Sequence, residues 1–89
     1  MTAFRRPDTA ILVRQRLLEN ADDVDALFVL AALRAQRGQV SEGLDILERV
    51  LRLDPAYPGA WRFKAKLHRM RGEVEAERSA WAKAEDVER

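Results

Sequence analysis

The chain has 89 residues, of which 47% are hydrophobic and 35% are charged, and its formal net charge is +1. This length leaves room for one small domain with a modest core, and the composition is typical of a folded helical protein rather than a disordered one. Cysteine is absent, which excludes a disulfide framework, a thiolate metal site and a thiol nucleophile. The apolar run at residues 10–13 is too short for a signal peptide or a membrane span, so we expect a soluble, cytoplasmic protein.

The first predicted helix covers residues 8–20 and follows an N-terminal arm, residues 1–7. Pro7 and Asp8 favour a helix start, because aspartate can accept the free amide hydrogens of the first turn and proline is tolerated there. Apolar residues then recur at helical spacing: Ala10, Val13 and Leu17. We expect the arm to be a loose segment.

Two helices joined by a tight turn are predicted in residues 24–57. The first should cover residues 24–37, with an aspartate just before it as its cap. Gly38 ends it, because a glycine past the last turn adopts the left-handed conformation at little cost. Ser41 is a candidate cap for the second helix, which should stop at the Asp-Pro pair of residues 54–55.

Residues 58–89 repeat this arrangement, with helices predicted over residues 58–71 and 75–88 and Gly72 between them. Polar residues replace apolar ones at two places where a further repeat would pack. Arg78 occupies the place that Leu44 has in the first unit, and Glu85 occupies the place of Leu51. This replacement indicates that the stack of repeats ends here.

The two halves of the chain share a period of 34 residues. Shifting the sequence by this period aligns residues of similar size: Ala26 with Ala60, Leu27 with Trp61, Ala31 with Ala65, Leu33 with Leu67, Gly38 with Gly72 and Val40 with Val74. Such a period indicates stacked helical hairpins. We therefore predict an all-α fold of five antiparallel helices in one domain, with a capping helix (8–20) and two repeats (24–57 and 58–89).

The order of small and large residues within this unit resembles the tetratricopeptide repeat. The first unit fits at Ala26, Leu27, Leu30, Ala31, Gly38, Gly43 and the closing Asp54-Pro55. The second fits at Ala60, Trp61, Ala65, Gly72, Val74, Trp81 and Ala84, but has Glu77 where a small residue is usual. The resemblance implies a right-handed solenoid whose first helices line a concave groove that binds peptides or helices, and it places Trp61 and Trp81 in the core.

The same resemblance assigns residues to the groove. They are Asp25, Phe28, Ala32, Ala35 and Gln36 in the first unit, and Gly59, Arg62, Lys66, Arg69 and Met70 in the second. Arg62, Lys66 and Arg69 share one helix side because they are spaced at i, i+4 and i+7. They suit either an ordinary solvated face or a partner with a hydrophobic anchor and acidic side chains, since guanidinium groups bind carboxylates through paired hydrogen bonds. Phe28 needs cover, from a partner or from the N-terminal arm.

An adaptor that binds a protein or peptide is thus the predicted function, and two alternatives stay open. Residues 45–72 hold seven basic and three acidic residues, and residues 73–89 hold six acidic and three basic ones. Nucleic-acid binding is motivated by the basic stretch, but the net charge near zero and the acidic C-terminal stretch disfavour it. Self-association is the stronger alternative, because solenoids usually need about three repeats. The acidic segment 85–88 of another chain would then pair with the basic face of residues 62–69.

Catalysis, a cofactor and a metal site are not expected. His68 is the only histidine and has no neighbours of ligand type in the sequence, so we interpret it as a polar helix residue. Glu73, Glu75 and Glu77 cross a turn and a helix start, where they complement the helix dipole and do not form an opposed acid pair. The excess of arginine over lysine favours a bacterial source with a GC-rich genome.

Overall fold

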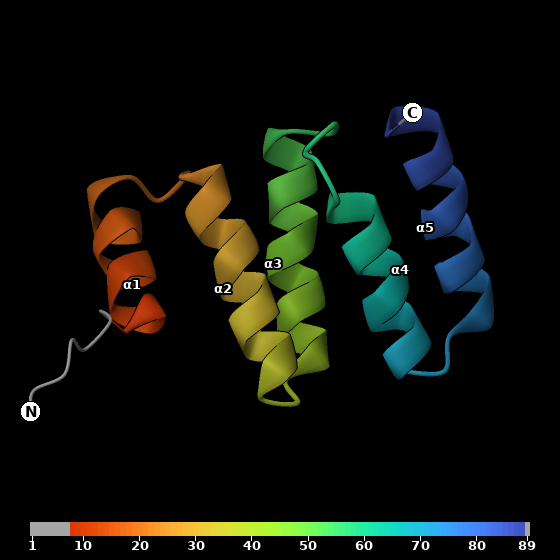
Figure 1. Cartoon of the computed structure of the whole chain (residues 1–89), viewed down its shortest axis with the longest axis horizontal. Coiled ribbons are helices and arrows are strands. Elements are labelled where there is room, and N and C mark those ends of the chain that lie inside the picture. The colour runs from red at the N-terminus through yellow and green to blue at the C-terminus, as the bar shows by residue number, and fades with distance from the viewer. Residues whose placement is uncertain (1–7, 89) are drawn as a thin grey trace, which may run out of the picture.

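The structure is a computed structural model that describes residues 8–88 and contains five α-helices and no strand in that range. The helices are α1 (Thr9–Glu19), α2 (Val24–Gln36), α3 (Val40–Leu53), α4 (Ala60–Met70) and α5 (Val74–Val87). They stand side by side in chain order, each antiparallel to the one before it (Figure 1). The predicted all-α stack of helical hairpins is confirmed. The N-terminal arm, residues 1–7, lies outside the described residues, and the division into a capping helix and two repeats stays a prediction.

Asp23 connects the first two helices. It is the residue that caps α2, where its Oδ1 accepts a hydrogen bond of 3.0 Å from the amide of Ala26. The same carboxylate accepts two hydrogen bonds of 2.9 Å from the guanidinium of Arg16 on α1. At the start of α1, Asp8 accepts a bond of 2.9 Å from the amide of Ala10. One aspartate therefore both starts α2 and holds α1 against it.

The turn between α2 and α3 is closed by backbone groups. Gly38 has a φ of 80°, and the amide of Gln39 donates a hydrogen bond of 2.9 Å to the carbonyl of Arg34. The helix then begins at Val40, and Gln39 precedes it without a side-chain capping bond. The prediction that Ser41 caps α3 was wrong, because the glycine turn lets the helix start before that residue.

The core lies where α2, α3 and α4 meet. Its largest fully buried side chains are Leu47, Val50 and Leu67. Gly43 of α3 faces α2 at this point: a Cβ added there would lie 3.0 Å from the carbonyl oxygen of Ala31 and 3.5 Å from Cδ1 of Leu67. The absence of a side chain at Gly43, one of the places that fits the repeat pattern, lets the two helices approach closely.

The two tryptophans differ in burial. Trp61 is half-buried against the core, whereas Trp81 is 44% exposed. One period before Trp81 stands Leu47, which is fully buried in a cluster that includes Ala60 and Leu67 of α4. No helix follows α5 within residues 8–88 to cover Trp81 in the same way. The expectation of a core position for Trp81 was wrong.

Candidate functional site

Phe28 belongs to a cluster of three aromatic rings. Its ring centroid lies 4.9 Å from that of Tyr57, in the loop between α3 and α4, and 5.7 Å from that of Phe63 on α4. We expected a partner or the N-terminal arm to cover this ring. The structure supplies cover from within the chain, so the cluster joins the first helix of one repeat to the first helix of the next.

Asp25 holds one end of this aromatic cluster. The Tyr57 hydroxyl donates a hydrogen bond of 2.6 Å to Oδ1 of Asp25. Burial and then the Asp25 carboxylate raise the pKa of Tyr57 to about 12, because both disfavour the phenolate. The hydroxyl is therefore protonated, and able to donate this bond, at any physiological pH.

The remaining predicted residues of α2 differ in accessibility. Ala32 is half-buried, and Gln36 is exposed at the end of the helix. Ala35 is only 8% exposed and belongs to the core cluster, where it lies beside the close approach at Gly43. A partner has no access to Ala35, and we therefore leave it out of the candidate surface.

The basic residues of α4 surround a hollow of about 450 Å³ between α4 and α5. Its lining consists of Arg62, Phe63, Lys66 and Arg69 from α4 and Glu77 and Trp81 from α5. We call this feature the α4–α5 hollow. It brings together the three predicted basic side chains around two aromatic rings. Met70, also predicted, is 54% exposed at the end of α4 but does not line the hollow, and Gly59 precedes α4 in a left-handed conformation with a φ of 81°.

Sequence reasoning missed the aromatic part of this hollow. Phe63 lies three residues before Lys66, so helical spacing places both on one side of α4, but Phe63 is not one of the groove places that the family resemblance assigns. Trp81 also carried a signal: it occupies a packing place that a following helix would cover, and polar residues already mark the outer side of α5 at Arg78 and Glu85. A large ring at an uncovered packing place predicts an exposed apolar surface.

The charges around the α4–α5 hollow are partly satisfied. The guanidinium of Arg62 lies 3.2 Å from Oε1 of Glu88, in the same chain. No ion pair within residues 8–88 involves Lys66 or Arg69. Two positive charges at the hollow are thus outside any ion pair in residues 8–88, although Glu77 lines the same hollow. One carboxylate of the acidic segment 85–88, which the self-association alternative would use, is already paired with Arg62.

His68 has a structural partner. Its Nδ1 lies 2.7 Å from Oε1 of Glu73, and Arg71 binds the other oxygen of that carboxylate at 2.8 Å. The hydrogen bond with His68 and the charge of Arg71 lower the pKa of Glu73. These contacts stabilise the turn between α4 and α5. Within the described residues, no group of three or more histidines or acids is placed to hold a metal ion.

The comparisons agree with this architecture. A tetratricopeptide repeat family model matches residues 24–67, which begin with α2 and end inside α4. No curated protein matches the chain. None of the helices in residues 8–88 has the length and hydropathy that crossing a membrane requires. Repeats of this family generally mediate interactions between proteins. The stacked hairpins and the match together show that the chain belongs to the tetratricopeptide repeat family.

Proposed function

We propose that this chain is a cytoplasmic, non-enzymatic adaptor that binds a protein segment with an apolar anchor and acidic side chains at the α4–α5 hollow. The observation that supports it is the pairing of two exposed cations, Lys66 and Arg69, with two accessible rings, Phe63 and Trp81, around one hollow. A bound partner would bury the exposed ring and supply carboxylates to pair with Lys66 and Arg69.

The rings and the charges have different roles in this proposal. Burying an aromatic anchor against Trp81 and Phe63 supplies most of the binding free energy, because aromatic contacts bury large apolar areas. Each rim charge contributes only about 0–1 kcal/mol while it stays solvated. Lys66 and Arg69 therefore act mainly on the association rate and on the choice of an acidic partner.

The aromatic cluster extends the proposed site toward the first repeat. Phe63 lines the hollow and also contacts Phe28, so a bound segment that continues past Phe63 reaches α2. There it meets Ala32 and Gln36, which offer a smoother surface without charge. We propose that this part accommodates the partner backbone and contributes less to specificity than the hollow does.

A capture experiment with matched charge variants tests the proposal. The test variant carries Lys66→Glu and Arg69→Glu, which leave the Arg62–Glu88 ion pair in place. The control variant carries Arg78→Glu and Lys83→Glu, two exposed cations of α5 that do not line the hollow. Because both variants change the net charge equally, a general electrostatic effect would weaken them alike.

We expect wild-type protein to capture a partner from a lysate of the source organism, the control variant to retain it, and the test variant to lose it. Trp81→Ala should lose the partner as well, since it removes the anchor surface. Retention of the same partner by the test variant and by Trp81→Ala would place the site elsewhere. Sedimentation that shows a wild-type dimer and a monomeric test variant would favour the self-association alternative.

A further inference from the structure

A second apolar groove lies on the side of α2 that faces away from Phe28, between α1 and α3. It consists of a hollow of about 360 Å³ between α1 and α2 and one of about 420 Å³ that reaches α3. Leu17 of α1 and Leu30 of α2 line both hollows, which therefore adjoin at these two side chains. We call the two hollows together the α1–α3 groove. Leu30 and Leu33 lie roughly opposite Phe28 around the helix, because successive residues advance by about 100°.

The corresponding junction of the second repeat holds a smaller hollow of about 290 Å³, which is lined by Glu48, Leu51, Arg52, Trp61 and Lys64. One period after Leu30 stands Lys64, whose ammonium lies 3.8 Å from Oε2 of Glu48 and 5.0 Å from the ring centroid of Trp61. One period before Glu48 stands Arg14. The first junction thus has an arginine and a leucine where the second has an ion pair over an aromatic ring. The lining is therefore mainly aliphatic at the first junction and carries an ion pair at the second.

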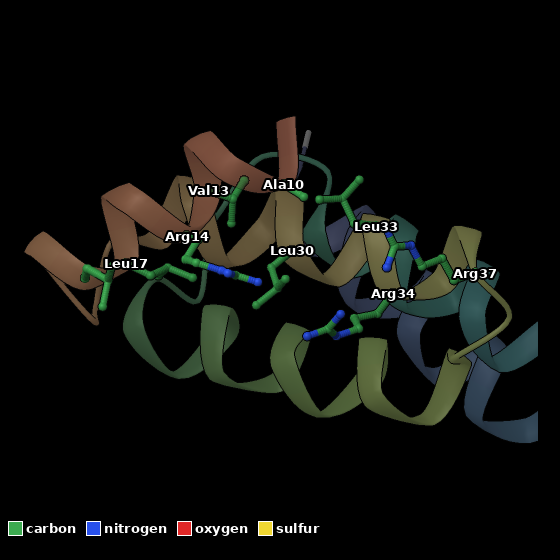
Figure 2. Close-up of a pocket in the computed structure, with 9 residues that line it drawn as sticks. Ala10, Val13, Arg14, Leu17, Leu30, Leu33, Arg34 and Arg37 are labelled. Carbon is green, nitrogen blue, oxygen red and sulfur yellow. The ribbon is translucent and has the colours of Figure 1, made fainter. Parts of the chain in front are cut away.

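Arginines flank the leucines of the α1–α3 groove. Figure 2 shows Arg14 projecting from α1 on one side of Leu30 and Arg34 from α2 on the other, with Arg37 farther along the helix. Arg34 lies 3.5 Å from Glu42. No ion pair within residues 8–88 involves Arg14 or Arg37. The groove therefore has an apolar floor and a mainly basic rim, on which Arg14 and Arg37 form no ion pair with a described residue, while Asp45 lines its α3 end.

The apolar surface continues along the outer side of α1. Leu18 lines the groove and is 81% exposed, and Ile11, seven residues earlier, shares its side of the helix and is also exposed. The groove wall runs from Ala10 to Leu18, a length of roughly 12 Å at the rise of an α-helix. A ligand of two to three helical turns matches this length.

We propose that the α1–α3 groove is a second binding site, which holds an acidic amphipathic helix of another protein. Aliphatic side chains of that helix would cover Leu17, Leu30 and Leu18, and its carboxylates would pair with Arg14 and Arg37. Charge complementarity selects this occupant. Residues 1–7 of the chain itself contain two arginines and no acid, so their charge does not complement the rim. This site does not depend on the function proposed for the α4–α5 hollow.

The second junction supplies a variant that replaces the apolar floor of the groove with an ion pair. Arg14→Glu with Leu30→Lys places at the first junction the pair that Glu48 and Lys64 form at the second. This double variant should fold, because the second repeat already accommodates that pair. A single variant, Arg37→Glu, reverses one exposed rim charge without touching the floor. Circular dichroism and the thermal midpoint verify the fold of both.

The probe is a fluorescein-labelled synthetic helix of about three turns, with leucine at every third or fourth place and glutamate elsewhere. A second peptide has lysine in place of each glutamate. We expect fluorescence anisotropy to show saturable binding of the acidic peptide only. Its Kd should rise at least about tenfold in the double variant and several-fold in Arg37→Glu, and should stay within about twofold in Lys66→Glu/Arg69→Glu. Two-dimensional amide NMR should show the largest shifts at Leu17 and Leu30.

Four results would overturn this proposal. One is a Kd that neither the double variant nor Arg37→Glu changes. Another is equal binding of the acidic and basic peptides, and a third is loss of binding in Lys66→Glu/Arg69→Glu with amide shifts confined to α4 and α5. The last is sedimentation showing that wild-type protein is a dimer and the double variant a monomer, which would make a second copy the occupant of the groove. The control at Lys66 and Arg69 keeps a failure here distinct from a failure of the adaptor function at the α4–α5 hollow.

Discussion

The Tyr57 hydroxyl donates a hydrogen bond of 2.6 Å to the Asp25 carboxylate, across a sequence separation of 32 residues. The bond joins the first turn of α2 to the loop that leads into α4. It holds Tyr57 against Phe28, whose ring centroid is 4.9 Å away. One long-range bond therefore orders the aromatic surface from which the α4–α5 hollow continues.

The environment of Tyr57 predicts a delayed phenol titration. Tyr57 is the only tyrosine in the chain, so the ultraviolet absorbance of phenolate reports on it alone. We expect a pKa of about 12, with burial as the first cause and Asp25 as the second. Asp25→Asn should lower this pKa toward the ordinary value of about 10 without reaching it, because burial persists. A wild-type value near 10 would contradict the contact.

The same pKa predicts how stability changes in alkali. Because the folded state raises the pKa of Tyr57, its contribution to stability is fully present below about pH 10 and is lost as the pH rises toward about 12. Tyr57→Phe removes the titrating group. Its free energy of unfolding, measured by urea denaturation, should therefore fall less than that of the wild type over this interval. If the free energy of unfolding of the two proteins fell equally over this interval, folding would not raise the pKa of Tyr57.

Gly43→Ala should destabilise the chain by up to about 2 kcal/mol. Alanine favours helix by up to ~1 kcal/mol over glycine, but overpacking at a close contact costs about 1–3 kcal/mol. The steric cost prevails because the nearest atom is the backbone carbonyl oxygen of Ala31, at 3.0 Å from the added Cβ, and it moves only if α2 moves. Urea unfolding measures the change, and a stabilised Gly43→Ala would show that the two helices can separate freely.

Ser41→Ala is the matched substitution in the same helix. Ser41 is exposed one residue into α3 and does not cap it, so we expect a change within about 0.5 kcal/mol. Loss of a capping serine would cost about 1 kcal/mol. A loss of that size in urea unfolding would restore Ser41 as the cap.

Leu47→Ala should cost about 2–5 kcal/mol, because it leaves a cavity at a fully buried place. Leu53→Ala, in the last turn of the same helix, removes the same atoms from a side chain that is 42% exposed, and should cost less than about 1 kcal/mol. Both changes in the free energy of unfolding are measured by urea denaturation, with one m-value fitted to both variants. Equal losses for the two variants would place the core elsewhere.

The lowered pKa values of Asp23 and Glu73 predict that the chain loses stability in acid. The amide of Ala26 is the main cause that lowers the pKa of Asp23, and the hydrogen bond with His68 is the main cause for Glu73. Because folding lowers both pKa values, each contribution is present above the ordinary values of 3.8 and 4.5 and is lost as the pH falls through the lowered ones. Thermal midpoints of Asp23→Asn and Glu73→Gln should fall less steeply below about pH 4 than that of the wild type. A wild-type midpoint that is constant from neutral pH down to strong acid would rule out both contributions.

The surface residues were predictable only in part. Arg62, Lys66 and Arg69 share one side of α4 by their spacing alone, and the structure gathers them at one hollow. Spacing along α4 does not predict which side chains α5 and the residues after it bring to the hollow. The exposed ring of Trp81 and the ion pair of Arg62 with Glu88 were therefore not predicted. Residues of the α1–α3 groove were assigned only to packing, because exposure depends on whether a neighbour covers them.

The sequence by itself determined the helices and their repetition. The 34-residue period, the glycines at 38 and 72 and the Asp-Pro pair at 54–55 act through backbone conformation and helical spacing, which are local properties that a sequence displays directly. The tertiary structure alone decided which side chains are covered. Phe28 lies under Tyr57 and Phe63, Ala35 is buried at a helix crossing, and Trp81 is exposed. Burial is the outcome of contacts between helices distant in sequence, and it is set only when all of them are in place.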